Sequence, residues 1–338
     1  MATARSSKAA YNLGMRVAGF ALLSLMALVA QAQSRTVAIT VDDLICANCA
    51  PAPLGGAVAH DAMEATNKRL VAGLAKAHIP VTGFVITRTI EEAGPAGLRA
   101  IQLWLDAGFD LGNHTYSHPN FADLSTEQME AEIARADASL RPLLAANHRN
   151  LQFVRFPYND TGDTQAKHVA VAAYLKEHGY QVATCTIDAS DYEFAAAYAR
   201  ALGAKDNATA ERIRQAYLDY SATEIDFYAA LNRKVLGYEP PQVMLIHDSL
   251  LNADSIDDLL ALFRSRGYGF VSLAQAQSDP AYATPDTYVT KYGPMWGYRW
   301  AIERNFGRIG LRESEPPSWV EDYANGKSGA DTAKPTTP

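Results

Sequence analysis

The sequence has no excess of positive charge and, beyond its first 30 residues, no long apolar run. Lys and Arg together number 30, against 37 Asp and Glu, and the formal net charge is −7. An acidic chain has no electrostatic footprint for DNA or RNA. A membrane-spanning helix needs about 20 consecutive apolar residues, and no stretch after the N-terminal region offers them. These absences argue against nucleic-acid binding and against a membrane span in the rest of the chain.

The N-terminal region has the features of a secretory signal peptide. Arg5, Lys8 and Arg16 precede the apolar and small residues 17–30, and "AQA" then provides a small-x-small cleavage site. We therefore predict a signal peptide over residues 1–32, with an uncleaved anchor as the alternative. Its removal takes away three positive charges and no acid, which brings the net charge to −10. The sequence thus predicts an exported protein, periplasmic or secreted.

Cysteine is scarce: Cys46, Cys49 and Cys185 are the three in the chain. In an oxidising compartment Cys46 and Cys49 could form a disulfide, and they could equally be free or bind a metal. A thioredoxin-like motif should open a helix, whereas "CANCAPAPLGG" predicts a loop. Cys185 lies in the apolar run "YQVATCTID" and is predicted to be a small buried residue.

Strand-like and helix-like patterns alternate along most of the chain, which is typical of βαβ units and a parallel sheet. About seven repeats over this length predict an α/β fold, a distorted (β/α) barrel of about seven parallel strands. In such a barrel the active site lies at the C-terminal ends of the strands. The predicted strands are residues 36–43, 79–87, 109–114, 151–158, 180–188, 242–248 and 267–273.

We predict one catalytic domain over residues 33–280, followed by a C-terminal extension, 281–338, whose last part is disordered. A helical insert, residues 193–240, separates the predicted fifth and sixth strands and is longer than a crossover needs. It is rich in aromatic residues. These either form the core of a small helical layer or wall a substrate cleft at the strand ends.

Ionisable side chains cluster where the predicted strands end. Asp43, His114 and His118 can form a metal site if the first and third strands are neighbours. Asp42 precedes Asp43 and, if the strand continues, faces the other way, so that it could serve as a base that activates water. Arg155 is a candidate to stabilise and fix that base. A chance His pair, a charged strand end and a structural ion pair are the respective alternatives.

These motifs resemble those of the polysaccharide deacetylases, the NodB-homology domains of carbohydrate esterase family 4. "TVDD", "HTYSH", "RFPY", "DASDY" and "LIHD" occur in the order and spacing of the family's five motifs, over most of residues 36–276. The resemblance implies that Asp43, His114 and His118 bind one divalent ion, Zn²⁺ or another such as Co²⁺. It also implies roles for five further residues: Asp42 as catalytic base, Arg155 as its orienting partner, the Tyr158 backbone N–H as oxyanion donor, His247 as general acid and Asp191 as the group that tunes His247.

Two positions depart from the family pattern. The residue after "RFPY" is often Gly in the family and is Asn159 in this chain, and the aromatic residue of the fourth motif is often Trp and is Tyr192. Tyr158 and Tyr192 are candidates for substrate binding, and the departures concern substrate fit rather than chemistry. Asp188 and Asp248 adjoin the motifs, where we expect them to be supporting carboxylates.

The resemblance implies a metal-dependent hydrolase that removes N-acetyl groups from N-acetylglucosamine units of a glycan of the chitin-oligosaccharide or peptidoglycan type. An O-acetyl polysaccharide esterase and a small-amide hydrolase are alternatives, because the same site cleaves either bond. A catalytically silent glycan-binding module is a third hypothesis. The presence of a base, a ligand triad and an acid argues against it. The expected partner is an acetylated glycan, and the sequence leaves the oligomeric state open.

Overall fold

The computed structural model describes residues 35–49, 57–289 and 291–327. Contacts within the chain define two units, residues 1–33 and 34–338, and every described residue belongs to the second. The predicted signal peptide and most of the tail predicted to be disordered lie outside the described residues. None of the described helices combines the length and the apolar character required to cross a bilayer.

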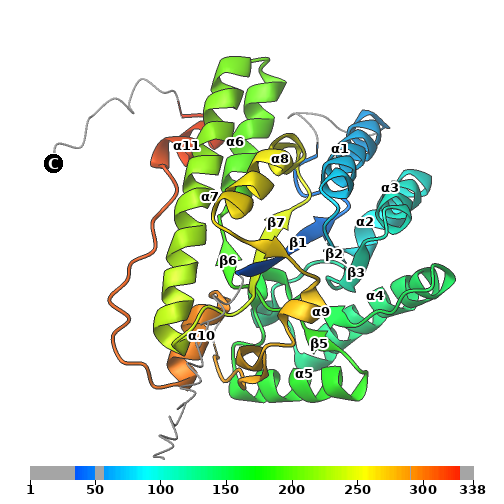
Figure 1. Ribbon diagram of the computed structural model, residues 1–338. Coiled ribbons are helices and arrows are strands. Elements are labelled where there is room, and N and C mark those ends of the chain that lie inside the picture. The colour runs from blue at the N-terminus through cyan, green and yellow to red at the C-terminus, as the bar shows by residue number, and fades with distance from the viewer. Residues whose placement is uncertain (1–34, 50–56, 290, 328–338) are drawn as a thin grey trace, which may run out of the picture. The chain divides into compact units, whose positions relative to one another are not determined.

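Parallel strands form the centre of the unit (Figure 1). β1 (Thr36–Leu44) lies between β2 (Val81–Val85) and β7 (Gln242–His247), and its apolar residues are buried on both faces, as expected for a central parallel strand. In the described residues the order is β5-β4-β3-β2-β1-β7-β6, and β8 pairs with the start of β1. The remaining strands are β3 (Asp110–Asn113), β4 (Phe153–Val154), β5 (Gln181–Val182), β6 (Ile187–Asp188) and β8 (Gly269–Phe270).

The predicted fifth strand, residues 180–188, is two strands rather than one. β5 pairs with β4 at one end of the strand order, whereas β6 pairs with β7 at the other end. The four residues 183–186 join them, and an extended chain of that length spans only about 15–18 Å. The two edges of the sheet must therefore lie close together, and the sheet is curved into a distorted barrel, which confirms the predicted fold class.

Polar side chains fill the gap between the two edges. Gln277 accepts a hydrogen bond from the Thr184 N–H at 2.8 Å and donates one to the Val182 carbonyl at 3.0 Å. From inside the barrel, Arg155 donates from Nε to the Ala183 carbonyl at 2.9 Å. These side chains replace the ladder that β5 and β6 cannot form with each other, because buried backbone groups need partners.

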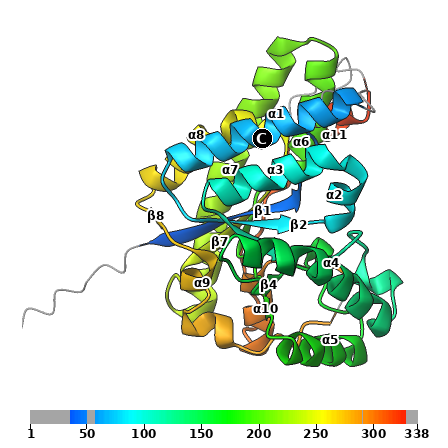
Figure 2. The same ribbon diagram turned by 90° about the vertical axis from the view of Figure 1, so that its right-hand side faces the viewer.

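Helices surround the sheet on its outside (Figures 1 and 2). Trp104 of α3 is fully buried and donates to Asn67 of α1, which joins these two helices. A capping box opens α4, with Ser125 and Gln128 each bonded to the other's backbone N–H. The helices of this layer are α1 (Ala57–Lys76), α2 (Thr87–Ala93), α3 (Pro95–Asp106), α4 (Thr126–Ala146), α5 (Gln165–Glu177), α8 (Leu250–Ser265) and α9 (Leu273–Ala276).

The predicted insert corresponds closely to α6 (Asp191–Gly203) and α7 (Asn207–Leu236), which pack on each other and on α8. Their aromatic side chains are mostly core. The buried ones are Phe194, Tyr198, Tyr217, Tyr220 and Tyr228. The helical-layer interpretation of these aromatics therefore holds, because α6 and α7 must bury a face against the sheet and α8.

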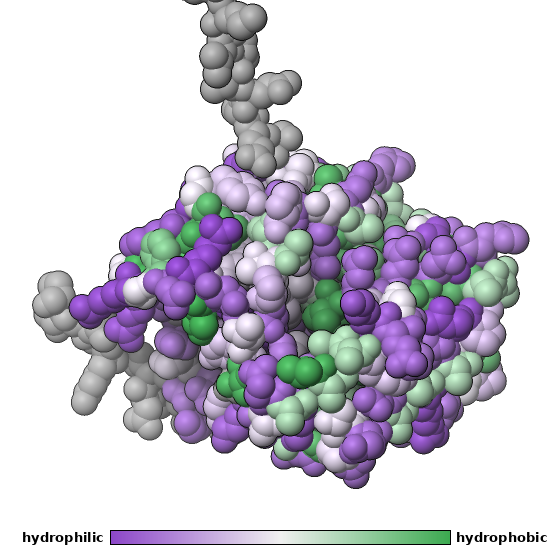
Figure 3. Space-filling view, turned by 90° about the horizontal axis from the view of Figure 1, so that it is seen from below, coloured by the Kyte–Doolittle hydropathy of each residue, from purple (hydrophilic) through white to green (hydrophobic). Residues whose placement is uncertain are grey.

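The C-terminal extension packs against this insert. After a short turn, η3 (Pro280–Ala283), it forms α10 (Trp296–Glu303) against α7 and α11 (Ser318–Ala324) against α6. Trp300 of α10 and Val320 of α11 are buried. Hydrophilic residues predominate on the face of the molecule seen in Figure 3, and hydrophobic ones form small separate groups.

Candidate active site

The predicted site residues meet in one cavity at the C-terminal ends of the strands. Its volume is about 530 Å³. Arg155 and Asp191 lie directly behind this lining, bonded to Asp42 and His247 respectively. The lining residues are Asp42, Asp43, His114, His118, Phe156, Tyr158, Asn159, Asp188, Tyr192, Leu245, His247, Gly293 and Met295.

Both acids at the end of β1 line this cavity, and the expectation that they face opposite ways is wrong. Asp43 has a left-handed backbone with φ 59°, and the pairing of β1 with β2 shifts register between Val41 and Leu44. A β-bulge of this kind interrupts strand alternation and redirects a side chain. The irregularity therefore brings two consecutive carboxylates to the same cavity with different partners.

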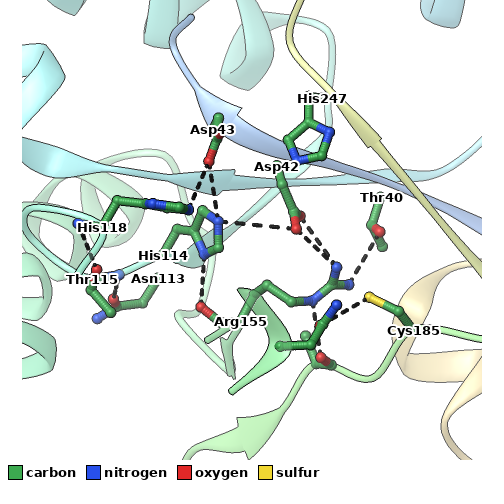
Figure 4. Close-up of polar contacts among 12 residues, drawn as sticks. Thr40, Asp42, Asp43, Asn113, His114, Thr115, His118, Arg155, Cys185 and His247 are labelled. Carbon is green, nitrogen blue, oxygen red and sulfur yellow. Dashed lines mark hydrogen bonds and ion pairs between the residues drawn. The ribbon is translucent and has the colours of Figure 1, made fainter. Parts of the chain in front are cut away.

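Asp43 and the two histidines converge on a single point (Figure 4). Asp43 Oδ1 lies 3.3 Å from Nε2 of His114 and 3.3 Å from Nε2 of His118. The ligand atoms of the three residues all lie within 4.8 Å of one another. His118 reaches this point from a loop in which its own φ is 59° and its N–H donates to Thr115 Oγ1 at 3.1 Å.

This arrangement fits a divalent cation. His114 Nδ1 lies 2.7 Å from the Arg155 carbonyl oxygen, which can only accept, so Nδ1 carries the proton. In a neutral ring, Nε2 then turns its lone pair toward Asp43 Oδ1, which is buried and has no hydrogen-bond donor among the described residues. Facing lone pairs repel unless a positive charge lies between them. An Asp-His-His set is suited to a borderline ion such as Zn²⁺.

The protonation states of two of the three residues favour the same role. Burial raises the pKa of the Asp43 carboxyl, but the neighbouring imidazoles of His114, His247 and His118 hold that pKa well below its usual range. Burial and the neighbouring His114 lower the pKa of His118 to about 4. An ionised carboxylate and a neutral imidazole are the forms that bind metal.

Asp42 has a different partner. Arg155 is fully buried and its Nη1 lies 3.0 and 3.3 Å from the two oxygens of Asp42. Nη2 of the same guanidinium donates to Thr40 Oγ1 at 3.2 Å, and the Nε contact with Ala183 fixes the plane of the group. Arg155 therefore fixes the position of the Asp42 carboxylate, as the sequence predicts.

His247 approaches the cavity from β7 and is held by Asp191. Its Nδ1 lies 2.7 Å from Asp191 Oδ1, and its backbone N–H donates to Asp191 Oδ2 at 2.7 Å. Asn252 also donates to Asp191 and to the His247 carbonyl, which makes the pair rigid. Burial lowers the pKa of His247, but the charge of Asp191 and its hydrogen bond raise that pKa to about 10, helped by Asp43 and Asp42. The imidazolium is thus a proton donor at neutral pH.

Two tyrosines stand at the rim of the cavity. Tyr158 is 58% exposed and its ring centroid lies 5.0 Å from that of His118. Tyr192 is 50% exposed, with its ring edge-on to His247 at 6.1 Å. Both positions suit contact with a substrate. Tyr192 directly precedes the predicted insert, and no described residue of 193–240 lines the cavity, which leaves the cleft-wall interpretation of that segment without support.

The sequence-based site prediction missed several lining residues, among them Gly293, Met295 and Asp188. Gly293 and Met295 come from the C-terminal extension, and neither has chemistry that a motif could reveal. Asp188, expected to be a supporting carboxylate, lines the cavity, and burial together with the charge of Asp191 raises its pKa to about 6. Asp248 is fully buried and absent from the lining, as a supporting residue should be.

The cysteines are free thiols. Cys49 is buried, and its N–H contacts the Cys46 sulfur at 3.0 Å, so the pair occupies a tight turn after β1 without a disulfide. Cys185 is buried as predicted and lies near Asn159 in the cavity wall.

Comparison with known proteins agrees with the motifs. A family model described as polysaccharide deacetylase matches residues 30–192, which include Asp42, Asp43, both histidines, Arg155 and Asp191. These residues therefore match the polysaccharide deacetylase family. His247 and the C-terminal wall of the cavity lie beyond the matched residues.

Individual relatives are distant. A chitin deacetylase from Arthroderma benhamiae is 33% identical over 88 residues, which is 26% of this chain and 22% of that protein, so the match spans about a fifth of the relative. Among solved structures, a CE4 family pseudoenzyme from Bacillus anthracis has a TM-score of 0.49 at 16% identity, covering 72% of this chain and 66% of that one. A family 4 carbohydrate esterase from Streptomyces lividans, in complex with acetate, has a TM-score of 0.45 at 20% identity, covering 72% and 95%.

Proposed function

We propose that this protein is an exported, metal-dependent hydrolase that removes N-acetyl groups from N-acetylglucosamine units of a glycan. The observation that carries the proposal is that two adjacent carboxylates in one cavity have different partners. Asp43 meets two histidines, whereas Asp42 meets a buried arginine, and a protonated histidine stands across the same cavity. The name of the chitin deacetylase relative supports an N-acetylated substrate.

Asp43, His114 and His118 would hold the divalent ion, for which we propose Zn²⁺, with Co²⁺ as a substitute. When bound, such an ion supplies a Lewis acid that polarises the acetyl carbonyl. Asp42 takes a proton from water, whose oxygen forms a bond to the carbonyl carbon. Arg155 keeps the Asp42 carboxylate in place for this transfer. The Tyr158 backbone N–H donates to the carbonyl oxygen as negative charge develops there.

The C–N bond then breaks, and the leaving nitrogen needs a proton because an amide anion is a poor leaving group. His247 supplies it from the imidazolium form that Asp191 stabilises. The products are acetate and a free amino sugar. The proton held by Asp42 returns the site to its starting state when it is passed back to His247 through solvent. Tyr158 and Tyr192 present ring faces suited to the C–H faces of sugars.

Acetate release from a substrate panel tests the proposal. The purified protein, loaded with Zn²⁺ or Co²⁺, is incubated with N-acetylglucosamine oligomers, peptidoglycan fragments and acetyl xylan. We expect release from the N-acetylated glycans. Release from acetyl xylan alone would assign the protein to the O-acetyl esterases instead. A folded, metal-loaded protein that releases acetate from none of them contradicts a hydrolytic function.

A further inference from the structure

The turn that carries Tyr158 has an unfavourable backbone. Tyr158 and Asn159 have φ values of 57° and 51°, so two consecutive non-glycine residues are left-handed. Side chains other than glycine rarely adopt this conformation, and it persists only when surrounding contacts hold it. Glycine takes it freely, and the family motif often places glycine at the position of Asn159. Some other part of this chain must therefore provide what glycine provides elsewhere.

The C-terminal extension makes the contacts that hold this turn. Arg299 of α10 is 2% exposed and donates from Nη2 to the Asn159 carbonyl. Its Nη1 donates to Thr161 Oγ1 at 2.9 Å and meets Asp286 at 2.6 Å, and its Nε donates to the Pro294 carbonyl at 3.0 Å. The planar guanidinium thus joins the turn to the extension through three nitrogens, which a lysine ammonium cannot do.

The backbone of the extension touches the same turn. A Cβ atom at Gly293 would lie 2.3 Å from the carbonyl oxygens of both Tyr158 and Asn159, so only glycine permits this approach. From the opposite side, the Asn159 side-chain oxygen accepts from the Cys185 thiol at 3.4 Å. The turn is therefore enclosed between the barrel and the extension, and Arg299 is the contact that binds its carbonyl.

We propose that Arg299 is a positioning residue for the deacetylation reaction: it holds the Tyr158–Asn159 turn in the left-handed conformation that presents the Tyr158 N–H to the cavity. Its catalytic consequence rests on the proposed function. Arg299 touches neither the proposed metal ligands nor the substrate position. It acts on the reaction through the turn, where asparagine stands in place of glycine.

A cycle of four proteins tests this inference: wild type, Arg299→Met, Asn159→Gly and the double variant. We expect Arg299→Met to lower kcat by about 100-fold with little change in KM, the size of effect of losing one oxyanion donor. In the Asn159→Gly background the same change should lower kcat by less than about tenfold, because glycine adopts the left-handed turn unaided. An equal fall in both backgrounds overturns the proposal.

Two controls separate positioning from stability. Trp300→Phe perturbs the packing of α10 beside Arg299 without touching the turn, so it should lower the melting temperature while kcat stays near wild type. If Arg299→Met does not fold, Arg299→Lys replaces it in the cycle. Lysine keeps the positive charge opposite Asp286 but lacks the planar guanidinium that contacts the turn. Loss of kcat in Trp300→Phe equal to that in the Arg299 variants counts against a specific role.

Hydrogen exchange, a measurement that does not depend on catalysis, distinguishes this proposal from the proposed function. The Asn159 and Asp160 amides donate to the carbonyls of Phe156 and Pro157 at 3.0 and 3.1 Å, so they report the turn directly. In metal-free protein we expect Arg299→Met to speed their hydrogen exchange at least about tenfold, with β7 unchanged. Unchanged exchange overturns the inference whatever the activity. Faster exchange in a protein that has no deacetylase activity supports the role of Arg299 in holding the Tyr158–Asn159 turn and rejects the proposed function.

Discussion

Asp42 and Asp43 are adjacent in the sequence, yet one contacts a guanidinium and the other two imidazoles. Their roles should therefore separate on mutation. We expect Asp42→Asn to retain the metal and lose about 10²–10⁴-fold in kcat, the usual contribution of a general base. Metal content by elemental analysis and acetate release from the same preparation check this.

Asp43→Asn is the matched control, because it makes the same chemical change one residue away. It should lose the metal together with the activity. Zn²⁺ added to wild type at about 100 times its dissociation constant should raise the free energy of unfolding by about 2.7 kcal/mol, and the Asp43 variant should not respond. If Asp42→Asn loses the metal instead, the two roles are exchanged.

In the proposed mechanism, Asp191 extends activity to high pH. The protonated form of His247 would be the active one, and Asp191 raises the pKa of His247, so we expect activity to be lost as pH rises through that value. Asp191→Asn removes the negative charge and lowers the pKa of His247. We expect the alkaline limb of the kcat profile to move to lower pH by at least about one unit. A limb that does not move would show that another group donates the proton.

At the residue scale, the sequence predicted which side chains pair with each other more successfully than it predicted how those side chains are oriented. The ligand triad and the Asp42–Arg155 pair follow from residue type and position at strand ends, because chemistry restricts which side chains can fill these roles. The Asp191–His247 pair follows from the family resemblance. The shared orientation of Asp42 and Asp43 could not be predicted, since the left-handed φ at Asp43 arises from the mismatch of β1 with β2. Gly293 and Met295 act by shape alone, which leaves no pattern to read.

At the element scale, the helices of the insert are a structural layer rather than a substrate wall. Phe194 is fully buried between α6 and α7, where it contacts Tyr217 and Tyr220. We expect Phe194→Ala to lower the free energy of unfolding by about 3–5 kcal/mol, the usual result of truncating a buried aromatic residue. Denaturant unfolding measures the loss.

The same variant tests substrate choice. If it folds, Phe194→Ala should rank acetylated substrates in the same order as wild type, because Phe194 does not line the cavity. Tyr192→Ala is the contrasting variant, since Tyr192 lies on the rim and is half exposed. A changed substrate order in Phe194→Ala, with an unchanged order in Tyr192→Ala, would indicate that the insert does help to form the substrate cleft.

The strand elements show where sequence patterns fail. Residues 180–188 form a strand-like run of mostly apolar and β-branched residues, and the sequence pattern assigns such a run to one strand. The break between β5 and β6 depends on barrel closure, in which Gln277 and Arg155 supply the missing partners from distant parts of the chain. Helix ends, by contrast, are decided locally, and the side chains of Ser125 and Thr164 cap the first turns of α4 and α5.

At the scale of the whole molecule, a buried acid of the insert lies close enough to feel the charges of Asp188 in the sheet and Glu313 in the C-terminal extension. Glu224 of α7 is fully buried, and neither carboxylate oxygen has a hydrogen-bond partner among the described residues. Burial raises its pKa to about 8, and the charges of Glu313 and Asp188 contribute. The folded state therefore keeps a proton that the unfolded chain releases near its ordinary value of about 4.3.

The raised pKa of Glu224 makes the folded protein less stable at higher pH. Between these two pKa values the folded state binds more protons than the unfolded state, so the free energy of unfolding falls as pH rises, by at most about 1.4 kcal/mol per pH unit. Glu224→Gln should remove this slope and make the protein more stable than wild type at pH 8. Urea unfolding at pH 5 and pH 8 provides the comparison. A wild-type curve that is flat over this interval, or a less stable Gln variant at pH 8, would contradict the assignment.

Because Arg299 holds the Tyr158–Asn159 turn from the C-terminal extension, the order in which the site residues are synthesised has a consequence. A growing chain completes the metal ligands with His118, gains the proposed acid with His247, and receives Arg299 last of all. A chain that ends after His247 and before α10 would thus carry the metal-ligand set beside a turn that Arg299 does not hold. On the proposed function, such a truncated protein would keep its metal ligands and hydrolyse glycans far more slowly than the full chain.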